Sequence, residues 1–239
     1  MMKKNFLVIG GTKGLGYSIA EKLSFEDNEI IITGRNYRDF LEEKIEFLKL
    51  DLNVSSKEEF FTLISKNNGF DGVTFAQRYR PINGFREYLK EIKIMVVAIA
   101  YFMEALREYN LSRKGDVKFT RIIVIGSNYS SKVGKDQGWE YHTVKSAQLS
   151  LVKYFSVNSE NLYNINLVSP ATYVKRGAKE YWESTELSKK WRSFPSKGLL
   201  SVDDIAEAVK SLLLEGHKYI SGNNIHIDGG LFNLYPDQV

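Results

Sequence analysis

Residues 6–23 read FLVIGGTKGLGYSIAEKL, and this stretch decides the fold. Phe6–Ile9 is an apolar run typical of a short buried strand. Leu15, Ile19 and Leu23 then recur at four-residue spacing, which predicts a helix with one apolar face. A strand that enters a helix through a glycine-rich turn is the opening unit of an open α/β sheet.

Glycines at positions 10, 14 and 16 allow a tight turn and a close approach of the backbone to a diphosphate. The helix N-terminus that follows supplies N–H donors and a partial positive charge. This spacing differs from the commoner G-x-G-x-x-G pattern, and a purely structural glycine turn is the alternative interpretation. We expect a nucleotide cofactor to be held by Gly10, Thr12, Lys13, Gly14, Leu15 and Gly16.

The rest of the chain alternates strands and helices. Further strands are predicted at Glu29–Thr33, Ile45–Leu50, Gly72–Ala76, Arg121–Ile125, Ile165–Val168 and Asn224–Ile227. Helices are predicted to open at residues 55–59 and to span Phe85–Tyr109, Tyr141–Asn158 and residues 201 to about 214. The pattern predicts a single α/β domain over residues 1–239, a Rossmann-like doubly wound parallel sheet of about seven strands with helices on both faces. The irregular, aromatic-rich stretch of about residues 171–200 is predicted to be a small helical lid over the substrate.

Composition excludes several classes of protein. Hydrophobic residues make up 43% of the 239 residues and charged residues 26%, as in soluble globular proteins. The net charge of +4 is too small and dispersed to favour nucleic acid. The apolar run before Gly10 is too short for a secretory signal, and the longest run, Ile94–Met103, is about half a membrane span. We expect a cytoplasmic protein without cysteine, membrane segment or metal site.

Basic residues follow the first two strands. Arg35 lies about twenty residues beyond the glycine turn, where an acid would hold the ribose 2′-hydroxyl of NAD. An arginine can instead pair with a 2′-phosphate, and Lys13 can add a second positive charge. These residues favour NADP(H), with two solvated surface charges as the alternative. Asp51, followed by Leu52, is placed either to accept from the adenine amine or to cap the next turn.

Tyr141 and Lys145 lie four residues apart at the start of a predicted helix. Both side chains therefore project from one helical face. An ammonium group favours the phenolate, so we expect Lys145 to lower the pKa of Tyr141 from about 10. The same spacing also occurs in ordinary surface helices, so the interpretation depends on the other motifs.

Taken together, these motifs resemble the short-chain dehydrogenase/reductase superfamily, from Lys4 to about Phe232. The glycine loop resembles the family's G-x-x-x-G-x-G motif, and Tyr141 and Lys145 its Y-x-x-x-K motif. Ser127 follows a strand similar to the one that presents the family's serine. The resemblance implies hydride transfer between nicotinamide C4 and a carbonyl or alcohol carbon, with a small-molecule substrate. It also implies that Tyr141 is the acid/base, Lys145 holds the nicotinamide ribose and Ser127 orients the substrate oxygen, while Lys13, Arg35, Asp51, Leu52, Ala76 and Pro170 contact the cofactor.

The sequence departs from the family pattern at several positions. Residues 74–77 read TFAQ where the family has Asn-Asn-Ala-Gly, and only Ala76 fits. The helix 85–109 lacks the family's relay asparagine, and Lys93 is near its expected place. The serine position is also open among Ser127, Asn128 and Ser130. These departures leave a catalytically weak or inactive NADP-binding sensor or partner subunit as the alternative function.

The sequence also suggests a substrate class and an assembly. We expect the lid aromatics to wall off the cleft, and basic residues at the ends of two strands to favour an anionic substrate; these are Arg78, Arg80, Lys175 and Arg176. Solvated loop charges are the alternative. The helices 92–109 and 143–158 carry more apolar surface than one sheet face hides, which predicts a homodimer or homotetramer.

Overall fold

The computed structural model describes residues 3–37, 44–79, 85–113, 115, 117–135, 137–178, 180, 183 and 200–233. Its strands are β1 (Asn5–Ile9), β2 (Glu29–Gly34), β3 (Ile45–Lys49), β4 (Gly72–Phe75), β5 (Thr120–Ile125), β6 (Tyr163–Pro170) and β7 (Asn224–Ile227). Its α-helices are α1 (Gly14–Ser24), α2 (Lys57–Lys66), α3 (Phe85–Ile92), α4 (Ala98–Ser112), α5 (Trp139–Val157) and α8 (Val202–Leu214). A π-helical turn, Lys93–Val97, separates α3 from α4, and short 3₁₀ turns span Asn128–Ser130 and Leu231–Asn233.

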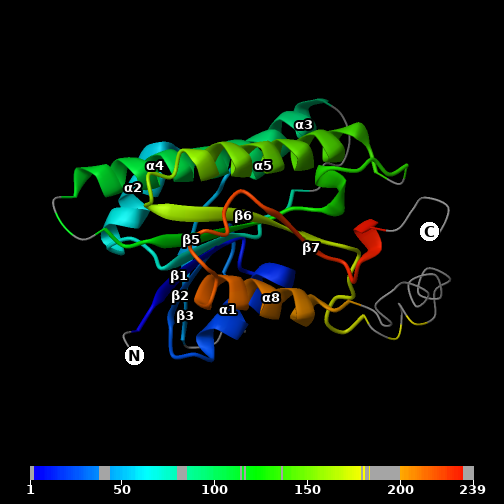
Figure 1. The fold of residues 1–239 in the computed structure, drawn as a ribbon, viewed down its shortest axis with the longest axis horizontal. Coiled ribbons are helices and arrows are strands. Elements are labelled where there is room, and N and C mark those ends of the chain that lie inside the picture. The colour runs from blue at the N-terminus through cyan, green and yellow to red at the C-terminus, as the bar shows by residue number, and fades with distance from the viewer. Residues whose placement is uncertain are drawn as a thin grey trace.

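The strands form one parallel sheet in the order β3-β2-β1-β4-β5-β6-β7 (Figure 1). Every neighbouring pair is parallel, so all carboxyl ends lie at one edge. The order reverses between β1 and β4, and ligands of open α/β sheets bind at such a switch point. The predicted Rossmann-like doubly wound sheet is therefore confirmed.

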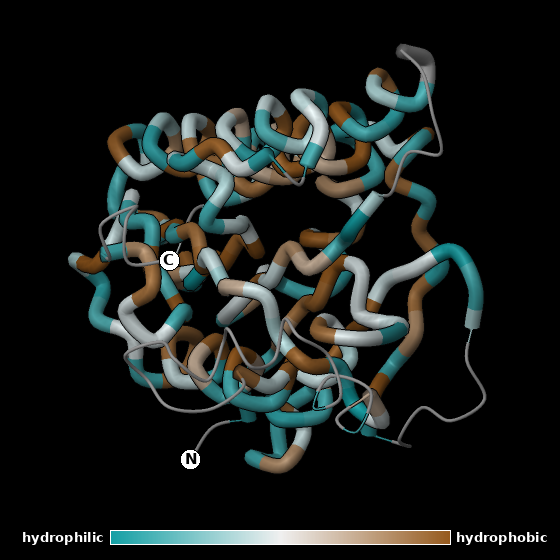
Figure 2. The backbone as a smooth tube through the Cα atoms, turned by 90° about the vertical axis from the view of Figure 1, so that its right-hand side faces the viewer, coloured by the Kyte–Doolittle hydropathy of each residue, from teal (hydrophilic) through white to brown (hydrophobic). Residues whose placement is uncertain are grey.

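Helices cover both faces of the sheet because the central strands are apolar on both sides. Leu7 and Ile9 of β1 pack in the layer that contains α2, α4 and α5, whereas Phe6 and Val8 pack against α1 and α8. The hydrophobic parts of the central strands run between these two helical layers in Figure 2. Fully buried strand residues of this kind are typical of parallel sheets.

The helix predicted over residues 85–109 is not α-helical throughout. It contains the π-helical turn, where two side chains bond to main-chain carbonyl groups, and the backbone stays helical on both sides of the turn. Gln77 Nε2 donates to Ile94 O at 3.3 Å, and Gln148 Nε2 donates to Met95 O at 2.9 Å. Nothing in the local sequence signals this turn, whose carbonyl groups contact side chains from the end of β4 and from α5.

Most of the predicted lid lies outside the described residues, as do Arg80 and the aromatic residues Tyr181, Trp182, Trp191 and Phe194. The described part begins after β6, where Val174 bridges to Ser201 at the start of α8. Within the described ranges, no helix is both long and apolar enough to cross a membrane.

Candidate active site

The glycine loop brings the ends of β1 and β4 into close contact. Gly10 has φ +78°, and a Cβ there would lie 2.6 Å from the backbone of Gln77. A Cβ on Gly16 would lie 2.3 Å from Gly10 O, so α1 begins directly against the end of β1. Gly14, the first residue of α1, has φ +56°. The loop therefore requires glycine at all three positions. Gly10 and Gly14 have positive φ angles, and a Cβ on Gly10 or Gly16 would overlap the neighbouring backbone.

The N-terminus of α1 is open to a ligand. Lys13 is the N-cap residue and makes no side-chain capping bond, and the first turn of α1 contains no acidic residue. The loop also touches the end of β2, because a Cβ on Gly34 would lie 2.5 Å from Thr12 Cγ2. Lys13 and Arg35 thus come from adjoining loops, and both side chains are exposed. This arrangement of N–H donors and positive charges suits a phosphorylated ligand.

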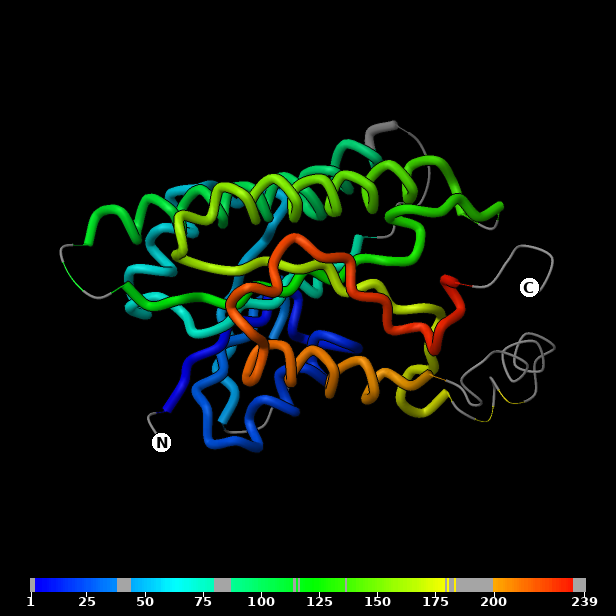
Figure 3. Tube along the Cα trace, viewed as in Figure 1, coloured from blue at the N-terminus to red at the C-terminus, as the bar shows by residue number. Residues whose placement is uncertain are grey.

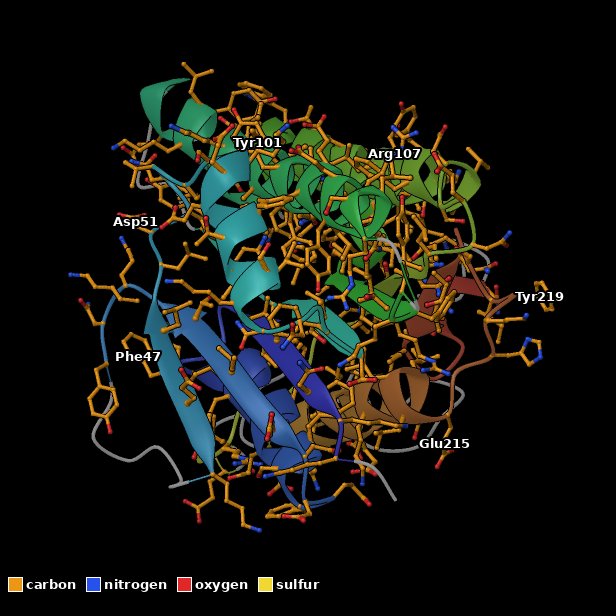
Figure 4. The ribbon with its side chains drawn as sticks, turned by 90° about the vertical axis from the view of Figure 1, so that its left-hand side faces the viewer. Phe47, Asp51, Tyr101, Arg107, Glu215 and Tyr219 are labelled. Atoms are coloured by element: carbon orange, nitrogen blue, oxygen red, sulfur yellow. The ribbon has the colours of Figure 1, made fainter. Side chains whose placement is uncertain are left out.

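Asp51 follows β3, the strand that carries Phe47 in Figure 4. Its Oδ1 accepts from the Asn53 N–H at 3.0 Å, and its main-chain oxygen accepts from Val54 and Ser55 at 3.1 Å. Asp51 therefore caps the following turn, which was one of its two predicted roles. The buried Leu52 is part of that turn.

Two other predicted cofactor residues end strands at the same edge of the sheet. The Ala76 N–H donates to Ile9 O at 2.8 Å, directly beside the glycine loop. Pro170 is the buried last residue of β6.

The three candidates for the substrate-orienting position differ in their bonding. Asn128 Nδ2 donates to Asp228 Oδ2 at 3.3 Å, and Asn128 Oδ1 lies 2.9 Å from His226 Nδ1, so this side chain joins the turn after β5 to β7. Ser130 is buried, and its Oγ accepts from the Ser127 N–H at 3.4 Å. Ser127 is only partly buried, and its Oγ accepts from the Tyr129 N–H at 3.2 Å. The hydroxyl proton of Ser127 has no acceptor assigned within this turn.

Tyr141 and Lys145 lie in the first two turns of α5, at the carboxyl edge of the sheet. Lys145 Nζ is 5.8 Å from the centre of the Tyr141 ring. The Tyr129 ring packs edge-on against Tyr141, with 6.1 Å between centroids. The turn after β5 thus lies beside the Tyr141 phenol, and the structure brings Ser127, Tyr141 and Lys145 to one edge.

Lys145 is almost completely buried, with 5% of its surface exposed. Its Nζ donates to Ile125 O at 3.1 Å and to Gln148 Oε1 at 2.9 Å. Burial lowers the pKa of Lys145, the positive charge of Arg78 adds to this lowering and the negative charge of Glu91 opposes it, so that the pKa falls to about 7 in total.

Two buried side chains near Lys145 were not identified from the sequence. Gln148 lies one turn further along α5 and connects Lys145 to the π-helical turn. Glu91, in the last turn of α3, has an exposed fraction of only 2%, and its Oε2 has no hydrogen-bond partner within the described chain. Gln148 is a polar residue within the apolar residues of α5, which is a sequence signal that could have marked it, whereas Glu91 lies among charged residues of α3 and has no such signal.

The basic residues predicted to face the substrate differ in their contacts. Arg176 forms ion pairs with Glu21 and with Asp203, so it fastens the segment after β6 to α1 and α8. These ion pairs direct its guanidinium to two carboxylates of the protein, and its predicted place among the substrate-binding residues stays a prediction. Lys93, Arg78 and Lys175 are exposed.

The comparisons with known proteins cover nearly the whole chain. The family model described as "Enoyl-(Acyl carrier protein) reductase" matches residues 10–232. Glucose 1-dehydrogenase 2 of Bacillus subtilis (strain 168) is 20% identical, covering 99% of this chain and 97% of that protein. The 3-oxoacyl-[acyl-carrier-protein] reductase FabG of Buchnera aphidicola subsp. Schizaphis graminum is 25% identical, covering 96% and 98%. The solved structure "ElxO with NADP Bound" has a TM-score of 0.78 and 22% identity, covering 98% of this chain and 100% of that chain.

Proposed function

This chain belongs to the short-chain dehydrogenase/reductase superfamily of oxidoreductases, and we propose that it is an NADP(H)-dependent enzyme that interconverts a carbonyl and an alcohol by hydride transfer. The observation that carries this proposal is the placement of Tyr141, Lys145 and Ser127 at the edge of the sheet where the glycine loop lies. Gly10 and Gly16 allow the tight turn that begins α1 directly behind β1, and the space beside Gly14 is open, which suits the approach of a dinucleotide diphosphate to the helix N-terminus.

The residues of the chain have distinct roles in this reaction. The bound cofactor supplies or accepts the hydride. In reduction, Tyr141 gives its phenolic proton to the carbonyl oxygen, and in oxidation the phenolate takes it back. Ser127 donates a hydrogen bond to the same oxygen and holds it near the phenol. The Lys145 ammonium stabilises the phenolate electrostatically, being 5.8 Å from the ring centre.

Lys13 and Arg35 support a preference for NADP(H) over NAD(H). Both are exposed on adjoining loops, where a 2′-phosphate could accept from both. Steady-state kinetics with NADPH and NADH, for wild type and Arg35→Ala, test this preference. We expect Arg35→Ala to raise the KM for NADPH about tenfold or more and to leave that for NADH nearly unchanged. Equal effects on both cofactors would contradict the assignment.

For the substrate, we propose a carbonyl compound that carries an anionic group. The support is the pair of exposed cations Arg78 and Lys175, which follow β4 and β6 at the carboxyl edge. Once a substrate is identified, Arg78→Ala should raise its KM without changing the KM for NADPH. An unchanged KM in both Arg78→Ala and Lys175→Ala would refute the anionic class.

One observation favours the alternative of a cofactor-binding protein without turnover. Lys145 Nζ is bonded to Ile125 O and Gln148 Oε1, so two of its three protons are committed to the protein. Incubating the protein with NADPH and a panel of small carbonyl compounds distinguishes the two functions by whether NADPH is oxidised. NADPH binding without any turnover across the panel would favour the sensor.

We also propose that the protein is a homodimer or homotetramer through α4 and α5. On α5, Trp139 is 56% exposed, Tyr154 60% and Val157 82%. Tyr101, on the outer helical layer in Figure 4, is only half-buried. Light scattering coupled to size-exclusion chromatography tests this assembly, and a monomeric mass at micromolar concentration would contradict it.

A further inference from the structure

The further inference concerns the buried Glu91, which no step of the proposed reaction uses. This carboxyl is 2% exposed, and its Oε2 has no partner among the described residues. An unpaired buried carboxylate is costly, so such a group is retained when it is neutral or compensated by a nearby charge. The question is which cation Glu91 faces.

The register of α3 against α5 answers this question. Tyr88 Oη lies 3.0 Å from Thr143 Oγ1, and further along both helices Gln148 Nε2 donates to Met95 O. Residue numbers rise together along the two helices, so they run parallel. Glu91 lies between positions 88 and 95, as Lys145 lies between positions 143 and 148. The two buried ionisable groups are therefore at the same level of the helix pair.

The hydrogen-bond partners of Lys145 are both neutral. Its Nζ donates to a main-chain oxygen and to the Gln148 amide oxygen, and the Gln148 amide nitrogen is committed to Met95 O. No ion pair within 4.0 Å joins Lys145 to Glu91 in the described part of the chain. Proton exchange between the two groups therefore requires a bridging water or a rotation of the glutamate side chain.

The neighbouring charges reinforce the pairing. Burial raises the pKa of Glu91; Lys145 and Arg78 oppose this rise, and Glu140 of α5 adds to it. On α3 itself, the Glu87 carboxylate is taken up by Lys90 and the Tyr79 hydroxyl. Lys93 of the π-helical turn is exposed. Burial thus moves the two groups in opposite directions, so that each becomes easier to convert to its neutral form.

We propose that the Glu91 carboxyl is the internal proton partner of Lys145, and that the two groups share one exchangeable proton between α3 and α5. In the exchange, the Glu91 O–H bond breaks and an N–H bond forms on the Lys145 amine, which gives a carboxylate and an ammonium; the reverse step restores the neutral pair. Its consequence for catalysis, which rests on the proposed function, is that Glu91 controls how much of the ammonium form Lys145 presents to Tyr141. Glu91 is thus a positioning residue that acts through Lys145.

The test compares Glu91→Gln with wild type, and Glu104→Gln serves as the matched control. The control removes the same charge from an exposed position on α4. The first readout is the titration of the Lys145 ¹³Cε signal by NMR, assigned by its absence in Lys145→Met. We expect the midpoint in Glu91→Gln to fall by about half a pH unit or more, because the ammonium loses its counter-charge. The control should titrate as wild type does.

The second readout is the pH profile of kcat/KM. In Glu91→Gln its alkaline limb should move to lower pH, so that activity relative to wild type falls about threefold or more between pH 6 and pH 8. An unchanged Lys145 titration in a folded Glu91→Gln, or in Glu91→Met if the glutamine variant does not fold, would overturn the proposal. Absence of turnover in every variant would instead refute the proposed function, since the NMR titration does not depend on it.

Discussion

Replacing Lys145 by methionine should change how the stability of the fold depends on pH. The folded protein holds Lys145 with a pKa of about 7, whereas the unfolded chain has the ordinary value of 10.5. Between these values the unfolded state binds more protons, so this lysine makes stability rise with pH. At 1.36 kcal/mol per pH unit, the penalty for burying the ammonium is about 5 kcal/mol at pH 6 and about 2 kcal/mol at pH 9.

Methionine has a similar length and no charge, so Lys145→Met removes this dependence. It also leaves Ile125 O and Gln148 Oε1 without their donor, at about 1–3 kcal/mol each. That loss does not depend on pH, so it shifts the difference between the two proteins without changing its slope. We therefore expect the stability of wild type relative to Lys145→Met to rise by about 2–3 kcal/mol from pH 6 to pH 9.

The assay is urea denaturation of both proteins at pH 6, 7, 8 and 9, followed by circular dichroism. Taking the difference between the two proteins cancels the titrating groups that do not interact with Lys145; Glu91, which does, gains a higher pKa in Lys145→Met and adds to the same direction of change. A constant difference across this range would show that Lys145 keeps its ordinary pKa, and the reasoning from burial would be wrong. An opposite slope would place the lysine in a strong ion pair.

Three further changes follow from the geometry. Gly10→Ala should destabilise the fold by about 2–4 kcal/mol and abolish cofactor binding, because the new Cβ would overlap the backbone at the end of β4. The control Gly115→Ala places its Cβ in open space and should have neither effect. Thermal melts measure the stability, and NADPH titration measures the binding. Gln148→Leu should cost about 2–4 kcal/mol in urea denaturation, since it breaks the bonds to Lys145 and to the π-helical turn. Asn128→Ala should lower the melting temperature by several degrees, because its side chain bonds to β7 and the residue after it. Its kcat should stay within about threefold of the wild-type value, and a hundredfold loss of kcat would show instead that Asn128 is catalytic.

The sheet could be predicted because its signals are local. The apolar run Phe6–Ile9, the glycines behind it and the helical repeat from Leu15 each follow from a few neighbouring residues. The parallel direction of the strands follows from the helices that separate most of them, and the C-terminal segment, red in Figure 3, contains β7, which lies at one edge of the sheet.

The parts of the site that could not be predicted depend on contacts between distant residues. The sequence left Ser127, Asn128 and Ser130 as alternatives, and it gave no sign that Asn128 bonds to His226 and Asp228, about a hundred residues away. The sequence around Arg176 reads the same whether the side chain faces a cleft or pairs with a carboxylate on α1, as it does here with Glu21.

The π-helical turn and the burial of Glu91 likewise arise from the packing of α3 and α5. A pattern of apolar spacing along α3 reports which face is covered, but it does not report which ionisable group lies across from it.

The most direct test of the central claim is the turnover of NADPH by wild type and Tyr141→Phe with a carbonyl substrate selected from a panel, followed by nicotinamide absorbance. We predict that Tyr141→Phe lowers kcat about a hundredfold or more while the Kd for NADPH changes less than about threefold, because only the proton donor is removed. Turnover by Tyr141→Phe at the wild-type rate would contradict the account.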